Sequence, residues 1–171
     1  MLTRKPKPVL YRRKREQKTD YGKRLQLLLA NKPRLVIRVT NQKLIGQLIE
    51  FTPKGDKVLE GVDSFMLKKL GWNHSCKNFP AAYLTGLLLG RKMQKKKIKE
   101  AVLDTGFINP FKKGKIYAFL KGSVEGGLNI PHDPEILPEE SRIKGKHIPT
   151  KGKPEEMASL VEQVKKKILS L

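Results

Sequence analysis

Positive charge gathers at the start of this chain, and that asymmetry limits the kind of structure the chain can form. Residues 1–38 contain 13 basic and 2 acidic residues and so supply +11 of the net charge of +21 carried by all 171 residues. Like charges at this density repel one another within a small fold, whereas each phosphate that they neutralise releases counterions and strengthens binding. A solubilising role is the alternative, but acidic residues serve it better than basic ones. The charge therefore predicts a polyanionic partner.

Enough apolar sequence is present for a folded body beside the charged segments. Hydrophobic residues make up 38% of the chain, and the runs at 34–40 and 81–89 supply core material that disordered basic tails lack. The length suggests one main domain. We expect the following divisions: a basic arm over residues 1–18 that is disordered alone, an α/β core domain over 19–130, an extended basic linker over 131–153, and a C-terminal helix over 154–171.

Hydrophobic periodicity predicts the elements of the core domain. Thr19 or Asp20 is a candidate N-cap for a first helix, which ends before Pro33. Three strand-like runs with short turns follow and predict an antiparallel meander, and a later strand that leads into a helix indicates a mixed sheet. The expected elements are a helix over 21–29, strands over 34–40, 44–51 and 57–64, a short helix over 65–70, a longer helix after Asn78, a strand over 101–104 and a helix over 116–124. The C-terminal helix has an apolar face that docks either on its own domain or on a neighbour.

Residues suited to catalysis are few. The sequence contains neither a phosphate-binding glycine loop nor a nucleophile elbow. The element order raises one enzyme class, the RNase-H-like nucleases, which hold two metal ions with clustered carboxylates, one of them on the first strand. That strand carries Arg34 and Arg38 instead, and Asp63 and Asp104 are better explained as caps or strand-end residues. We therefore expect no enzyme.

Metal, cofactor and membrane signals are also weak. The single cysteine, Cys76, allows no disulfide within the chain, which suits a reducing cytoplasm. His74 lies close to it, but this spacing is a poor signal for zinc. We expect no metal, cofactor or small-molecule substrate. Apolar runs stay well short of a membrane span, and Met1–Arg15 has no apolar signal-peptide region, so we expect no membrane association.

Binding chemistry is better supported, and the cations of residues 1–38 are its candidates. Arg34 and Arg38 share one face of their strand, because side chains an even number of positions apart point the same way, so both are expected to extend the arm's contact onto the sheet. Tyr11 is a candidate for stacking on unpaired bases, whereas Tyr21 is expected in the core. RNA is favoured over DNA, because the sequence shows no DNA-binding helix pair, zinc finger or heptad array and a basic arm suits irregular RNA.

Ordered motifs along the chain resemble one family of ribosomal proteins. They are Arg12–Glu16, Lys18–Tyr21, Lys32–Arg38, Pro53–Asp56, Gly71–Trp72, Pro80–Leu88, Leu103–Asp104, Lys121–Gly122, Gly127–His132 and Ile136–Pro138. Together they are similar to the archaeal form of the large-subunit ribosomal protein L eighteen family, whose eukaryotic relative is called L five. The similarity runs from about residue 9 to Ile148, and Pro80–Leu88 is its most specific part.

The resemblance implies a structural protein of the large ribosomal subunit, located in the cytoplasm within the ribosome. It implies that the chain binds 5S ribosomal RNA in the central protuberance and contacts 23S ribosomal RNA and neighbouring large-subunit proteins. It also implies a mixed-sheet α/β fold of RNase-H-like architecture without catalysis. The expected RNA-binding residues are Arg12, Arg13, Lys14, Arg15 and Lys18 in the arm, Lys32, Arg34 and Arg38 around the first strand, and Arg24 between them. The loop 107–113 is more basic and aromatic than the family pattern, which leaves its role open.

Overall fold

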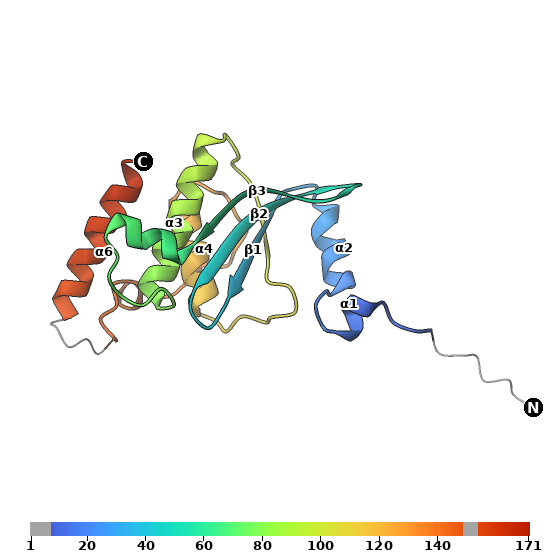
Figure 1. Ribbon diagram of the computed structural model, residues 1–171, viewed down its shortest axis with the longest axis horizontal. Coiled ribbons are helices and arrows are strands. Elements are labelled where there is room, and N and C mark those ends of the chain that lie inside the picture. The colour runs from blue at the N-terminus through green and yellow to red at the C-terminus, as the bar shows by residue number, and fades with distance from the viewer. Residues whose placement is uncertain (1–7, 149–153) are drawn as a thin grey trace, which may run out of the picture.

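A four-stranded sheet with helices on both faces organises the fold (Figure 1). The computed structural model describes residues 8–148 and 154–171. Its elements in chain order are the helices α1 (Arg12–Arg15) and α2 (Tyr21–Leu29), the strands β1 (Arg34–Val39), β2 (Leu44–Thr52) and β3 (Gly55–Asp63), the 3-10 helix η1 (Ser64–Leu70), α3 (Phe79–Lys95), β4 (Val102–Asp104), α4 (Lys115–Glu125), the 3-10 helix η2 (Pro134–Ile136), α5 (Glu140–Ile143) and α6 (Pro154–Leu169).

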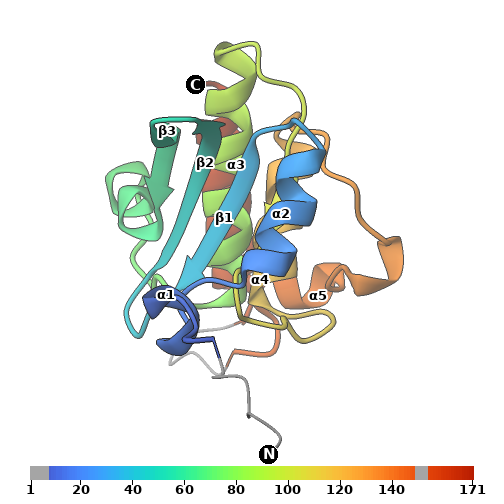
Figure 2. The ribbon, with the colours of Figure 1, turned by 90° about the vertical axis from the view of Figure 1, so that its right-hand side faces the viewer.

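The strand order is β3-β2-β1-β4. β1 pairs antiparallel with β2, and β2 with β3, while β4 joins β1 in parallel. This confirms both the predicted meander and the mixed sheet. Alternation along β1 buries Leu35 and Ile37 on one face and puts Arg34 and Arg38 on the other. α3, α4 and α6 lie on the side of Leu35 and Ile37, and α2 lies over the opposite face (Figure 1, Figure 2).

α3 and α4 form the closest helix pair of the core. Asn78 starts α3 by accepting a hydrogen bond from the backbone N–H of Ala81 at 2.9 Å. Further along, the backbones of the two helices touch: a Cβ atom on Gly122 of α4 would overlap the carbonyl oxygen of Tyr83. A Cβ atom on Gly86 of α3 would likewise overlap the backbone of α4. Glycine is therefore required on both helices at this crossing.

Replacing Gly122 with alanine should lower the free energy of unfolding by about 3 kcal/mol or more, because the helices must separate to admit the methyl group. Gly22→Ala in α2 is the matched control, since a Cβ atom there meets only the Asp20 carboxylate, at 3.5 Å. Alanine favours a helix, so this control should be neutral or stabilise the protein by up to about 1 kcal/mol. Urea unfolding measures both variants. Equal stability of Gly122→Ala and the wild type would contradict the close approach.

α6 docks on its own domain, which settles the alternative that the sequence left open. Met157, Val161, Val164 and Ile168 on its inner face are at most 3% exposed, and the helix packs against α3. The periodic apolar residues of this helix are therefore core residues rather than a surface for a neighbouring molecule.

A cluster of polar side chains joins α3, α4 and α6 where the three helices meet. The hydroxyl of Tyr83 donates a hydrogen bond to the carboxylate of Glu125. The ammonium of Lys165 pairs with the same carboxylate at 3.1 Å and lies over the Tyr83 ring, 5.3 Å from its centroid. Burial, followed by the hydrogen bond to Glu125, raises the pKa of Tyr83 to about 12.

This raised pKa makes stability depend on alkaline pH. An unfolded tyrosine loses its proton at a pKa of about 10, whereas folded Tyr83 holds its proton until about 12. The stability that the neutral phenol contributes is full below pH 10 and is lost as the pH rises through 12. Tyr83→Phe should remove this part of the alkaline loss. Unfolding free energies of both proteins across this pH range measure the difference, and parallel curves would contradict the prediction.

Residues 131–148 are more structured than the extended linker that the sequence predicted. They contain η2 and α5, and Ile143 of α5 is 5% exposed. Leu137 and Ile148 also pack against the core. Few apolar residues occur in this stretch, but these three reach the core, which the sparse pattern did not reveal. Residues 149–153 of the predicted linker lie outside the described residues.

Part of the basic arm has a regular conformation: residues 12–15 form one helical turn, α1, in which no residue is buried. The disorder that we expected of the isolated arm stays a prediction. The Glu16 carboxylate pairs with Arg12 and with Lys18, at 2.8 Å in each case. This one acidic residue offsets part of the repulsion among the arm's cations, which accounts for the local order. Residues 1–7 of the predicted arm lie outside the described residues.

Candidate nucleic-acid interface

α2 is held on the sheet by polar contacts rather than by a buried apolar face. None of its residues is buried. The carboxylate of Asp20 caps its start by accepting from the backbone N–H of Lys23 at 3.1 Å. The Lys23 ammonium reaches the segment after β4, where it donates to the Thr105 hydroxyl at 2.9 Å and to the Gly106 carbonyl at 3.2 Å. Charged and polar groups therefore determine where this helix lies.

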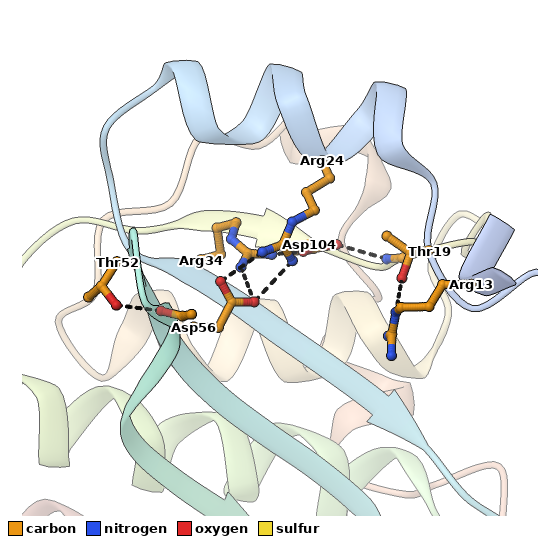
Figure 3. Close-up of polar contacts among 9 residues, drawn as sticks. Arg13, Thr19, Arg24, Arg34, Thr52, Asp56 and Asp104 are labelled. Carbon is orange, nitrogen blue, oxygen red and sulfur yellow. Dashed lines mark hydrogen bonds and ion pairs between the residues drawn. The ribbon is translucent and has the colours of Figure 1, made fainter. Parts of the chain in front are cut away.

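Four charged side chains from four elements form the main link between α2 and the sheet (Figure 3). Arg24 of α2 donates from both terminal nitrogens to the Asp56 carboxylate of β3, at 3.0 and 2.8 Å. Arg34 of β1 donates one terminal nitrogen to Asp56 at 2.9 Å and the other to Asp104 of β4 at 2.7 Å. Arg34 is only 3% exposed. Its buried charge is thus compensated on both sides.

This network favours the charged forms of Asp56 and Arg24. Partial burial alone would raise the pKa of Asp56, but the hydrogen bonds from Arg24 and Arg34 outweigh burial and hold that pKa below its ordinary value. The hydrogen bond to Asp56 in turn raises the pKa of Arg24. A carboxyl group with a lowered pKa stabilises the fold above its unfolded pKa, and this stability is lost only as the pH falls through the folded value. The attachment of α2 therefore persists at neutral pH.

A groove of about 470 Å³ lies between the α1–α2 segment, the outer face of β1 and the residues after β4. Val36 and Ile49 of the sheet contribute apolar surface to it. Among the described residues, its cations are Arg13, Lys18, Lys23, Arg24, Arg34 and Arg38, and its carboxylates are Asp20, Asp56 and Asp104. Six cations against three carboxylates leave the groove positively charged, so it is suited to a polyanion.

Comparison with known proteins shows the family. Residues 7–100 match the family described as "Ribosomal large subunit proteins 60S L5, and 50S L18". The chain belongs to this family. A large ribosomal subunit protein uL18 of Korarchaeum cryptofilum is 48% identical to it over 156 residues, which cover 91% of this chain and 80% of that protein. The large ribosomal subunit protein uL18 of Methanococcus maripaludis is 42% identical over 185 aligned positions, which cover 95% and 96% of the two chains.

Membership in this ribosomal family confirms the resemblance that the sequence motifs indicated. The chain is a structural constituent of the large ribosomal subunit and not an enzyme, and its place is the ribosome of the cytoplasm, with ribosomal RNA and ribosomal proteins as partners. The carboxylates weighed for a nuclease have other roles. Asp104 pairs with Arg34, and Asp63 caps η1 by accepting from the N–H of Met66 at 3.2 Å.

Nine basic residues were predicted from the sequence to bind RNA. The groove brings together five of them: Arg13, Lys18, Arg24, Arg34 and Arg38. The other four lie outside it. Arg12 is paired with Glu16, and Lys32 is paired with Glu100 at 2.7 Å near the far end of β1. Lys14 and Arg15 extend from α1 and are exposed.

Arg34 is not the exposed contact that strand alternation predicted. Alternation correctly placed Arg34 and Arg38 on one face of β1. α2 and the β2–β3 hairpin cover that face at Arg34, where Asp56 and Asp104 form ion pairs with the guanidinium. The same face is open at Arg38, which is exposed. A strand pattern specifies the face on which a residue lies, but not what covers that face.

The sequence analysis missed some groove residues, and it misplaced Tyr21, which lies outside the groove. Lys23 was one basic residue among many in its segment. No pattern in the neighbouring sequence indicated that it contacts the residues after β4. Phe107 and Ile108, which line the groove, belong to the loop whose role was left open. Tyr21 was expected in the core but is 38% exposed, and its ring lies 5.5 Å from that of Tyr11 between centroids.

The structure gives no sign of a metal site or a membrane span in the residues it describes. Within residues 8–148 and 154–171, no cluster of three or more His, Cys, Asp or Glu side chains is arranged to hold a metal ion. None of the helices there has the length and apolar character needed to cross a membrane. Cys76 is buried as a free thiol, and burial raises its pKa.

Arg34→Gln should lower the free energy of unfolding by about 3 kcal/mol, because it leaves Asp56 and Asp104 without their shared buried partner. Arg38→Gln is the matched control, since Arg38 lies on the same strand face but is exposed. Its stability should change by less than about 0.5 kcal/mol. Urea unfolding of both variants tests the difference, and equal stabilities would argue against the buried ion pairs.

Proposed function

We propose that this chain binds 5S ribosomal RNA and anchors it in the central protuberance of the large subunit, where it also contacts 23S ribosomal RNA. The groove beside α2 is the observation that carries the proposal, because six cations line it against three carboxylates. An RNA backbone compensates this excess, since phosphate oxygens match guanidinium and ammonium groups in charge and in hydrogen-bond geometry.

Available donors near the groove support the proposal. Arg13 donates its Nε–H to the Thr19 hydroxyl at 2.8 Å, which orients the guanidinium (Figure 3). Arg38 has no ion-pair partner among the described residues, and the same holds for Lys14 and Arg15 of α1. These side chains can turn toward phosphates without first breaking a contact to a carboxylate.

A second group of exposed lysines supports contact with another RNA segment. Lys95, Lys97 and Lys99 are exposed at the end of α3, far from α1 (Figure 1). Lys92 and Lys96 in the same stretch are less available, because both pair with one carboxylate of β3, at 3.0 and 2.7 Å. Two separate cationic surfaces suit a protein that contacts both 5S and 23S ribosomal RNA.

Binding to 5S ribosomal RNA at a series of salt concentrations tests the proposal directly. The logarithm of the association constant should fall linearly with the logarithm of the salt concentration, with a slope of about −0.7 to −0.9 per phosphate contact. A duplex RNA of equal length measures the affinity that comes from charge alone. Weak binding of 5S ribosomal RNA with a shallow salt dependence would contradict the proposal.

Removing residues 1–18 should weaken 5S binding by about tenfold or more and make the salt slope shallower, while the core domain stays folded. The segment contains eight basic residues and one acidic residue, and all its described residues are exposed. Filter binding gives the affinity, and urea unfolding gives the stability. Arg38→Gln, which keeps the arm, should reduce the slope by about one. Full affinity of the truncated protein would exclude the arm from the interface.

A further inference from the structure

The loop between β4 and α4 carries large apolar side chains that are exposed to different degrees. Phe111 is 88% exposed, and Phe107 and Ile108 are 43% and 49% exposed. Three such side chains within five residues form a local apolar patch, and a patch of this kind on a stable protein marks a contact surface. We call residues 105–114 the aromatic loop.

Hydrogen bonds at its two ends hold the aromatic loop in one shape. At its start, the carboxylate of Asp104 accepts from a loop N–H at 2.9 Å. At its end, the N–H of Lys113 donates to the carbonyl of Ile136 at 2.9 Å, and the N–H of Gly114 donates to the carbonyl of Phe111 at 3.0 Å. A loop that is ordered in advance loses little conformational entropy on binding. The backbone that carries Phe111 is therefore anchored before the RNA binds.

The positive charge around the Phe111 ring indicates which kind of partner the aromatic loop contacts. Residues 105–115 contain three lysines and no acidic residue, and Lys112 and Lys113 directly follow Phe111. Lys113 makes only a 3.5 Å pair with Glu139, in which both side chains are at least half exposed; such a pair stabilises little. An aromatic ring flanked by cations is the combination that binds single-stranded nucleic acid, because bases stack on the ring and phosphates meet the cations.

The aromatic loop is continuous with the proposed RNA groove. Phe107 and Ile108 line that groove together with Arg13 and Lys23. An RNA strand whose backbone follows the groove cations therefore passes the loop, in which Phe111 follows Ile108 by three residues.

We propose that Phe111 stacks on an unpaired base of the RNA whose backbone lies in the groove, so that the aromatic loop distinguishes looped RNA from a continuous duplex. This inference rests on the proposed function and adds a contact to a base where the groove cations contact only phosphates. A continuous duplex offers no free base face, because each base is already stacked on its neighbours.

Phe111→Ala should raise the Kd for 5S ribosomal RNA by about 5- to 150-fold, the range for losing one stacked base. The salt slope should not change, because no charge is removed. Phe111→Trp should keep the affinity, because tryptophan also stacks. Lys112→Gln should lower the slope by about one. Affinity for a continuous RNA duplex of equal length should be the same for the wild type and both Phe111 variants.

Leu171→Ala is the control for loss of an exposed apolar side chain, since Leu171 is 49% exposed at the end of the chain, and it should bind like the wild type. Unchanged 5S affinity of Phe111→Ala would overturn the inference, and so would an equal loss of affinity for the duplex. If the wild type binds 5S RNA with a steep salt slope in the same assay, the proposed function survives that result. If the wild type does not bind, both fail.

A photoreactive phenylalanine analogue at position 111 identifies the neighbour in the assembled large subunit. The expected crosslink joins it to a nucleotide that is unpaired in the RNA. A crosslink to a ribosomal protein alone would overturn the inference, because it would show that the ring faces a protein.

Discussion

Arg34 is the residue on which the arrangement of the N-terminal part depends. Its guanidinium joins β1 to β4 through Asp104, and it joins the β2–β3 hairpin and Arg24 of α2 through Asp56. Leaving the buried charge of Arg34 unpaired would cost several kcal/mol, so its two carboxylate partners are fixed with it, and Arg24 is held through Asp56. Because α2 has no buried residue of its own, these four side chains also fix one wall of the groove.

Local signals in the sequence were sufficient for most of the core. Asn78 before Pro80 marked the start of α3, and alternating apolar residues marked β1. A strand followed by a helix after Asp104 indicated the parallel partner of β1. Each of these signals depends on residues close together in the chain, whose preferences act in the same direction as the final packing.

Interactions between distant residues account for what the sequence did not reveal. The partners of Arg34 lie 22 and 70 positions away, and no pattern within β1 announces them. The hydrophobic periodicity of residues 21–29 predicted a helix with an apolar face, yet Leu25 and Leu29 in α2 remain 62% and 73% exposed. Periodicity shows that a helix has an apolar face but not whether the same chain covers it. Charge alone likewise indicated only that the partner is a polyanion, and membership in the family identified that partner as ribosomal RNA.

The pairing of Arg24 with Asp56 has a consequence for how the interface responds to ionic strength. A cation that is already neutralised by a carboxylate brings no net charge to a phosphate, so it displaces no sodium or potassium ion from the RNA. In the proposed interface, Arg38, which has no ion-pair partner among the described residues, is free to displace such an ion. The groove therefore holds two classes of arginine: Arg38, whose charge would make RNA binding sensitive to salt, and Arg24 and Arg34, whose charges are already used by the fold. We accordingly expect the proposed interface to release fewer ions than the number of basic side chains that line the groove.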